Sequence, residues 1–328
     1  MFAQDDLVAT LSHGSSLKTY MGADALATAY TAAVAGDVIT LSPGEFNGVT
    51  IEKAITIRGA GMQQIESGGY VYTQITGDMP INVPTTSSSS SAVVTIEGVQ
   101  VLGRVDIDGD NLAPVKLLKS RIQNTVMGKG VSLNAYSCIF DNGLDANNEE
   151  NTTFNCLNCV IRGAYFRGIS GLYNAIARVV ATNCIVCLNC DVPNSNFTNC
   201  IIVSSDWPLN QTCSAQNCIG INSNRYDNVD VFANVDGSSN VMIEGAEIDA
   251  FTKVFKTLTT TFYSFNFNET FELTPTAAAA YLGDDGKQVG IYGGVTPFDP
   301  APTNPQIKKF AVSSTAEGDK LKVKIDVK

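Results

Sequence analysis

A short phrase of polar and apolar residues recurs through the middle of the chain. Each copy has a polar residue, then Cys or Ser, then two mostly apolar residues, and the copies begin at Lys119, Ser137, Asn158, Asn183, Asn199 and Asn217. Successive Ser or Cys positions are 18, 21, 25, 16 and 18 residues apart. A period that varies around 20 residues predicts coils of three short strands, joined by turns of unequal length.

Stacked coils place equivalent residues above one another at a spacing of about 4.8 Å. The repeated Asn residues are therefore expected to form a hydrogen-bonded ladder at a turn. Nearly all parallel crossovers are right-handed. The predicted fold class is thus all-β, a single-stranded right-handed parallel β-helix, which is a solenoid.

The ends of such a stack need covers, because a bare end exposes the core and an unpaired strand edge. Residues 23–35 are predicted to form this cover as a helix, with Leu26, Tyr30, Ala33 and Val34 on one face and Gly36 at its end. The first coil is then expected to contain strands at residues 38–41, 49–51 and 55–57, with a turn at Pro43 and Gly44.

At the other end, Leu321, Val323, Ile325 and Val327 alternate with lysines, which predicts a hairpin over residues 307–328. This hairpin is expected to act as an end cap, or to dock with its basic face on an acidic partner. The predicted organisation is an N-terminal segment left after signal-peptide removal (1–20), a capping helix (21–36), the β-helix (37–298), and a Pro-rich linker with the C-terminal hairpin (299–328).

Charge and hydropathy limit the partners. The formal net charge of −11 disfavours nucleic acid, because affinity for phosphate backbones comes from Lys and Arg. No stretch reaches the roughly 20 apolar residues of a membrane span. Phe2-Ala3-Gln4 before two aspartates resembles the end of a bacterial signal peptide, so we expect a secreted, periplasmic or cell-surface protein, and a monomer.

Two segments resemble a known superfamily. Residues 36–46 (GDVITLSPGEF), followed by residues 55–61 (ITIRGAG), are similar to the opening coil of pectin-lyase-like right-handed parallel β-helix proteins. Residues 283–294 (GDDGKQVGIYGG) with Pro297-Phe298 resemble the closing motif of uncharacterised exported β-helix proteins of gut Bacteroidetes. The resemblance spans about residues 23–310 and implies the β-helix fold.

The resemblance implies the fold of that superfamily better than it implies its catalytic chemistry. Its pectate-lyase-type members use Ca²⁺ held by carboxylates together with a basic residue, and its polygalacturonase-type members use Asp residues with a Gly-His-Gly motif. The only histidine of this chain is His13, outside the predicted solenoid. A shared fold does not determine function.

Asp106, Asp108 and Asp110 alternate as in a calcium loop. Asn111 stands where an EF-hand needs Gly, and Leu117 where it needs Glu, so the EF-hand interpretation fails. Alternation along a strand still places Asp106 and Asp108 on one face, which leaves a surface Ca²⁺ site or a solvated strand face as alternatives. No other cofactor is expected.

Five repeat cysteines are expected to stack as a structural ladder of small buried side chains: Cys138, Cys159, Cys184, Cys200 and Cys218. The spacing from Cys156 to Cys159 and from Cys184 to Cys190 also resembles a zinc site. Neighbouring coils would equally allow one or two disulfides, although stacked side chains point the same way. Reduced thiols, zinc and disulfides are the three interpretations.

Two apolar residues follow each of these cysteines, although a strand alternates its faces. Either the chain bends so that both columns face inward, or one column points outward, namely Ile139, Val160, Ile185, Ile201 and Ile219. An outward column is either an exposed apolar stripe for a partner or is buried under a loop.

Candidate carbohydrate-binding residues follow two of the repeats. These are Trp207 with Asp206, and Tyr165 with Arg167, since aromatic side chains next to charged groups suit sugar rings. An acidic loop with Asp141, Asp145, Glu149 and Glu150 offers carboxylates for glycosidic acid and base work, or solvated loop charge. No catalytic residue is assigned. We expect a non-catalytic protein that binds or displays polysaccharide or cell-surface glycan, with a polysaccharide lyase or glycoside hydrolase as the alternative.

Overall fold

The computed structural model describes most of the chain, and its secondary structure is mainly β. The described residues are 7–63, 72–84, 93–108, 112–124, 126–128, 130–146, 152–162, 169–170, 178–188, 193–204, 208–222, 229–235, 237–245, 248–257, 269–301, 303, 307–312 and 323–327. Among them, no helix has the length and apolar character needed to cross a membrane.

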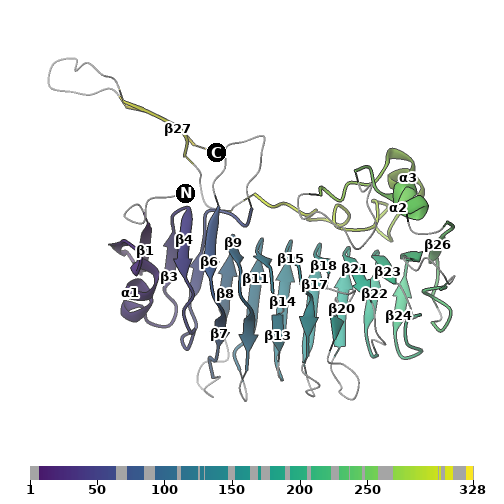
Figure 1. Ribbon diagram of the computed structural model, residues 1–328, viewed down its shortest axis with the longest axis horizontal. Coiled ribbons are helices and arrows are strands. Elements are labelled where there is room, and N and C mark those ends of the chain that lie inside the picture. The colour runs from purple at the N-terminus through teal and green to yellow at the C-terminus, as the bar shows by residue number, and fades with distance from the viewer. Residues whose placement is uncertain are drawn as a thin grey trace.

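Most strands belong to three long sheets (Figure 1). Sheet A has 11 strands, which are β2 (Ser16–Met21), β1 (Val8–His13), β3 (Val38–Leu41), β5 (Thr56–Arg58), β8 (Val94–Glu97), β11 (Val115–Leu118), β14 (Ser132–Tyr136), β17 (Thr153–Leu157), β20 (Arg178–Thr182), β22 (Asn196–Thr198) and β24 (Ser214–Gln216). Sheet B has 10 strands, which are β4 (Gly44–Asn47), β6 (Thr73–Thr76), β9 (Val99–Val101), β12 (Arg121–Ile122), β15 (Ile139–Phe140), β18 (Val160–Ile161), β21 (Ile185–Leu188), β23 (Ile201–Ser204), β25 (Ile219–Asn222) and β26 (Val241–Ile243). Sheet C has five strands, which are β7 (Met79–Ile81), β10 (Val105–Ile107), β13 (Val126–Gly128), β16 (Leu144–Asp145) and β19 (Ile169–Ser170).

The chain visits these sheets in rotation. It passes from β8 in sheet A to β9 in sheet B and β10 in sheet C, and then returns to sheet A with β11, which pairs with β8. The pairings of β14 with β11 and of β17 with β14 are parallel too, each with the preceding sheet A strand in the sequence. We call one such A–B–C passage a coil. Parallel stacking of coils is what the varying period of about 20 residues predicts.

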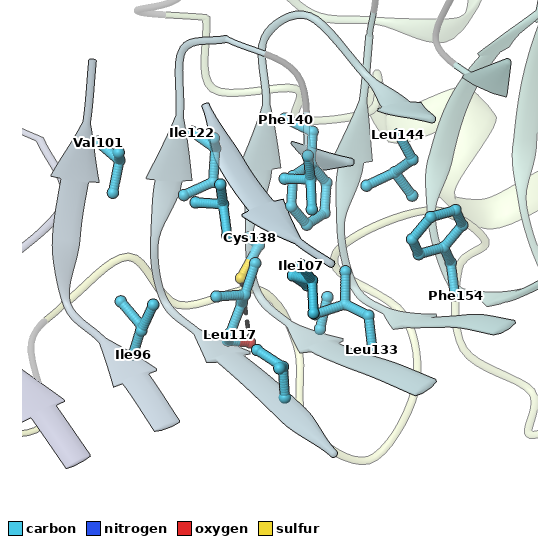
Figure 2. Packing of buried hydrophobic residues seen from close by; sticks show 14 of the residues in the cluster. Ile96, Val101, Ile107, Leu117, Ile122, Leu133, Cys138, Phe140, Leu144 and Phe154 are labelled. Carbon is cyan, nitrogen blue, oxygen red and sulfur yellow. Dashed lines mark hydrogen bonds between the residues drawn. The ribbon is translucent and has the colours of Figure 1, made fainter. Parts of the chain in front are cut away.

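The interior between the sheets is filled by apolar columns (Figure 2). Ile96, Leu117 and Ala135 are register partners on successive sheet A strands, and all three are fully buried. Figure 2 shows Val101, Ile122 and Phe140 of sheet B converging with these side chains. Alternation along each strand accounts for this, because every second side chain points into the core.

A regular corner joins sheet A to sheet B. From β11 onward, two residues lie between each sheet A strand and the next sheet B strand. The first of the two has a positive φ between 46° and 54° in Lys119, Ser137, Asn158, Asn183, Asn199 and Asn217. Asn adopts this left-handed conformation more easily than most residues, which explains its recurrence.

The N-terminal part differs from the sequence prediction in detail. The helix α1 runs over Ala25–Ala32, shorter than residues 23–35, and Val34 is exposed while Leu26 is buried. Residues 49–51 form no strand, and β4 begins at Gly44, where a turn is predicted. The antiparallel pair β1–β2 is absent from the prediction. It extends sheet A, because β1 also pairs antiparallel with β3.

A second apolar core lies on the outer face of sheet B. The helices α2 (Ile248–Val254) and α3 (Pro275–Ala280) and the chain after them lie over this face, and Figure 1 shows that chain running back along the strands. We call the described residues between 248 and 303 the C-terminal cover. Its Phe251, Val289, Ile291 and Phe298 pack against the outward column of sheet B. The residues of this column are each at most 3% exposed, namely Ile139, Val160, Ile185, Ile201 and Ile219. The outward column is therefore buried under a later segment, and the exposed apolar stripe is wrong.

The last two strands form a separate two-stranded sheet. β27 (Ile307–Val312) pairs antiparallel with β28 (Val323–Val327). Residues 313–322, which connect these two strands, lie outside the described residues.

Candidate functional site

Two carboxylates share the outer face of sheet C. Asp106 lies between the buried Val105 and Ile107 of β10, and Asp145 follows the buried Leu144 in β16. Asp106 and Asp145 are both register partners of Met127 in β13, so they belong to one outward column. Two strand spacings separate them, which is about 10 Å along the stack.

The candidate calcium ligands are Asp106, Asp108 and Asp110, of which Asp106 lies on this outer face of sheet C. Asp106 is half-buried and Asp108 is exposed, while Asp110 lies outside the described residues. Within the described chain, no three His, Cys, Asp or Glu residues form a group suited to a metal ion. Ca²⁺ takes six to eight oxygen ligands, of which these two side chains would supply only a part.

A buried ionic cluster lies on the outer face of sheet B. Arg121 Nε donates to Asp141 Oδ2 at 2.9 Å, and these side chains are only 7% and 4% exposed. Arg121 is the register partner of Ile139, so the cluster adjoins the apolar column at its N-terminal end. Asp141 Oδ1 is buried and has no hydrogen-bond partner among the described residues.

Burial dominates the electrostatics of this cluster. Loss of solvent raises the pKa of the Asp141 carboxyl to about 6, although the positive charges of Arg121 and Arg162 act to lower it. Burial likewise lowers the pKa of the Arg162 guanidinium. The sequence predicts Asp141 in an acidic loop, but its carboxylate is buried in an ion pair with Arg121 of the preceding coil. An ion pair of this kind suits a structural role between coils better than contact with a polymer.

The five ladder cysteines lie one above another at the A–B corner. The backbone N–H of Cys138, Cys159, Cys184 and Cys200 each donates to the Sγ of the next cysteine along the stack, at 3.4 to 3.5 Å. Cys138 Sγ in turn donates to Leu117 O at 3.2 Å, the dashed line in Figure 2. The thiols therefore satisfy backbone groups of the corner as well as filling space, a role that the sequence analysis missed.

The zinc-like spacing brings only some of its cysteines together. The side chains of Cys156 and Cys159 bond to each other, but no group of three that suits a metal ion forms among the described residues. Cys184 points into the interior core, whereas Cys187 belongs to the second core on the outer face of sheet B. Cys190 lies outside the described residues, and the eight described cysteines are all free. Burial raises the pKa of the Cys159, Cys184 and Cys200 thiols well above the usual range, which keeps them protonated.

The candidate carbohydrate-binding residues Trp207, Asp206, Tyr165 and Arg167 lie outside the described residues, as do Glu149 and Glu150. In the sequence, Tyr165 and Arg167 follow β18, and Asp206 and Trp207 follow β23.

The outer face of sheet A is open to solvent and polar. Lys116, Asn134 and Asn155 are register partners in one outward column, and Leu118, Tyr136 and Leu157 form the next. Asn155 Nδ2 donates to Asn134 Oδ1 at 3.2 Å, which links two coils. The sequence analysis did not single out this face. Polar residues between buried ones in VKLL, SLNAY and TFNCL are the signal that could have identified it.

Comparison of the chain with protein-family models and with curated proteins finds no match in either.

Proposed function

We propose that this chain is an exported or cell-surface protein that binds or displays carbohydrate without cleaving it. In this proposal it is a right-handed, pectin-lyase-like parallel β-helix, with α1 as the N-terminal cap and β27–β28 as the C-terminal hairpin. The A–B–C rotation of parallel strands and the two similar sequence segments support the fold. The resemblance of residues 283–294 to exported β-helix proteins supports export.

One observation carries the binding function. One outward column of sheet A contains Lys116, Asn134, Asn155, Asn196 and Ser214, all at least partly exposed, and Val180 of β20 is the apolar member of this column. A repeated row of amides and hydroxyls offers hydrogen bonds at intervals of about 4.8 Å. A linear sugar polymer presents hydroxyl groups at intervals of the same order. The face thus suits a polymer better than a small ligand, which needs a concave site.

A glycoside hydrolase is the second candidate, because Asp106 and Asp145 share an outward column. Inverting glycosidases place their two carboxyl groups about 6.5 to 9.5 Å apart, close to the spacing expected over two strands. Binding without cleavage is favoured because Asp141, whose carboxyl pKa is raised to about 6 by burial, is enclosed in an ion pair with Arg121. A general acid needs such a raised pKa in an open site.

Retention and release of polysaccharide test this proposal. Purified protein is applied to immobilised plant, mucin and microbial polysaccharides, and new reducing or unsaturated ends are assayed in the same samples. Retention without new ends is expected. New reducing ends without unsaturated ends, which disappear in Asp106→Asn and Asp145→Asn variants, would establish the hydrolase instead.

A further inference from the structure

Sheet A has one covered end and one open end. At the covered end, the chain that follows β24 closes the edge: Asn240 Nδ2 donates to Ala215 O at 2.9 Å, and Asn217 N donates to Ser238 O at 3.2 Å. At the open end, β2 is the terminal strand, and in the described structure it pairs on one side only, with β1. An unpaired edge strand is a template for pairing with another chain. The end of sheet A at β2 can therefore accept a further strand.

Three residues of β2 present their backbone to this open edge. Gly22 N donates to Leu7 O at 2.9 Å, which fixes the phase of hydrogen bonding between β1 and β2. Every second residue of β2 bonds to β1, so the backbone groups of Leu17, Thr19 and Met21 point away from it. Within the described chain, no hydrogen bond reaches the backbone groups of these three residues. The edge thus offers three N–H donors and three C=O acceptors.

The side chains of the same three residues lie on the outer face of sheet A. Leu17 is 72% exposed and Met21 is 69% exposed, and Thr19 between them is exposed as well. A strand edge that is both unpaired and apolar favours association with another strand.

The sequence of β2 is complementary to itself about Thr19. When a second copy of β2 lies antiparallel, with its Thr19 opposite Thr19, Leu17 lies opposite Met21 of the partner subunit. This register pairs all three donors of each edge with all three acceptors of the other. Apolar pairs and a pair of threonines directly opposite each other stabilise antiparallel strands.

Charge does not oppose this pairing. The protein has a net charge of −11, but β2 contains no Asp or Glu, and its one charged residue is Lys18. A lysine on an edge strand usually hinders pairing. Here Lys18 Nζ lies 5.0 Å from the centroid of the Tyr20 ring, and in the self-paired register the partner's Tyr20 lies directly opposite Lys18. The ammonium group therefore keeps an aromatic face beside it, and the two lysines are not opposite each other.

From these observations we infer that β2 is a dimerisation edge. Two copies of the chain pair antiparallel along β2, about a two-fold axis at Thr19, and their two A sheets become one continuous sheet. Each copy uses its open edge in this contact, so the assembly closes at two copies. The interface contains one strand from each copy, which places it among the small, concentration-dependent interfaces. This dimer replaces the monomer expected from the sequence, and it does not depend on the proposed carbohydrate binding.

Sedimentation velocity tests the dimer over a range of about 1 to about 100 µM protein. We expect the wild type to shift from the monomer mass toward twice that mass as the concentration rises. Thr19→Glu places two carboxylates opposite each other at the axis and should raise the dissociation constant about tenfold or more. Ser132→Glu is the control, because Ser132 is exposed on β14 of the same sheet and the change in net charge is the same. Thermal unfolding of each variant verifies that it is folded.

Disulfide crosslinking tests the register. Directly opposite residues of a hydrogen-bonded antiparallel pair have Cα atoms about 5.5 Å apart, which a disulfide can span. Under mild oxidation with copper phenanthroline, Thr19→Cys should therefore form a covalent dimer, and Ser132→Cys, the matched exposed control, should not. The eight described native cysteines are buried, so they do not compete for the oxidant.

Three results would overturn the dimerisation edge. The first is a wild type that remains monomeric up to about 100 µM. The second is a dimer that Thr19→Glu weakens no more than Ser132→Glu does. The third is a dimer that crosslinks no faster through Thr19→Cys than through Ser132→Cys. The last two would show that the copies associate through another surface.

Discussion

At the residue scale, the A–B corner is where sequence and structure correspond most closely. Each coil needs one left-handed residue there, and Asn supplies both the conformation and a side-chain amide. The sequence predicts that these amides bond to one another along a ladder. Only Asn217 Nδ2 to Asn199 Oδ1, at 3.4 Å, shows such a bond among the described residues. Asn158 instead binds the C-terminal cover, and Asn199 binds both Asn217 and the cover.

Asn158 therefore stabilises a long-range contact. Its Nδ2 donates to Ile291 O at 2.7 Å and to Gly293 O at 2.9 Å. We predict that Asn158→Gly, which keeps the left-handed backbone accessible, lowers the free energy of unfolding by about 2 kcal/mol, because two buried carbonyls lose their donor. Urea denaturation measures this change.

Asn217→Gly is the matched control, since Asn217 occupies the same corner and its side chain bonds only to Asn199 in the described structure. Equal losses in the two variants would show that the cover contributes nothing through Asn158.

Asp141 predicts a pH dependence of stability. Its pKa is raised by burial to about 6 in the folded protein, against an ordinary value of 3.8. The folded state thus holds this proton more tightly than the unfolded state. Protonation of Asp141 therefore adds to the free energy of unfolding below about pH 4, and this contribution is lost as the pH rises through about 6. Relative to Asp141→Asn, the wild type should lose about 2 kcal/mol of unfolding free energy between pH 4 and pH 7, because the unfolded chain is already about half ionised at this carboxyl at pH 4. Urea titrations at each pH measure the difference, and a difference that stays constant would contradict the assignment.

At the element scale, the C-terminal cover turns the outer face of sheet B into a core. Glycines of the closing motif allow its close approach: an added Cβ at Gly294, whose φ is +78°, would lie 2.2 Å from Asn183 Nδ2. Gly290 N donates to Asn199 O at 2.8 Å, and Asn199 Nδ2 donates to Asp284 Oδ1 at 2.7 Å. The motif is therefore shaped by the corner on which it lies.

Ile291→Ala tests the contribution of this cover. Ile291 is 1% exposed in the second core, so its truncation should lower the free energy of unfolding by about 2 to 4 kcal/mol. Val295 is 87% exposed on the same segment, and Val295→Ala should change stability by less than about 0.5 kcal/mol. A loss at Ile291 as small as that at Val295 would mean that the cover is not packed on sheet B.

The sequence predicts some elements and not others for physical reasons. Period and alternation predict the stacked strands, because burial of every second side chain is a local pattern. The pair β1–β2 could have been predicted from its alternation around Gly14, whose φ is +56°. The segment that covers the outward column of sheet B could not have been predicted. Asn158, at the corner beside that column, bonds to Ile291 of the cover, 133 residues later, and no local pattern encodes such a contact. The open face of sheet A was missed since its residues are ordinary polar strand positions.

At the scale of the whole molecule, the end of the cover links distant coils. Asp299 pairs with Lys119, and Thr303 Oγ1 donates to Glu97, after the same segment has bound Asn199 and Asn158. A stack in which each coil contacts only its neighbours unfolds as a sum of local terms. A segment that spans several coils makes their unfolding more cooperative.

Cutting this segment should therefore loosen the stack. A site-specific protease recognition sequence inserted after Val295, which is exposed, allows the chain to be cleaved in the folded protein. We expect cleavage to lower the melting temperature by about 5 °C and to broaden the transition, as measured by calorimetry. The uncleaved insertion variant is the control, and identical transitions before and after cleavage would show that residues 296–303 do not couple the coils.

The corner between sheets A and B limits where this protein can accept an insertion. Two residues join sheet A to sheet B in every coil from β11 onward, and the cover occupies the outside of that corner at Asn158 and Asn199. The other two corners vary in length. The connections from β15 to β16 and from β18 to β19 show this between sheets B and C, and those from β13 to β14 and from β16 to β17 show it between sheets C and A. We therefore expect extra peptide, whether acquired in evolution or grafted as an epitope, to be tolerated at the B–C and C–A corners and to disrupt the fold at the A–B corner.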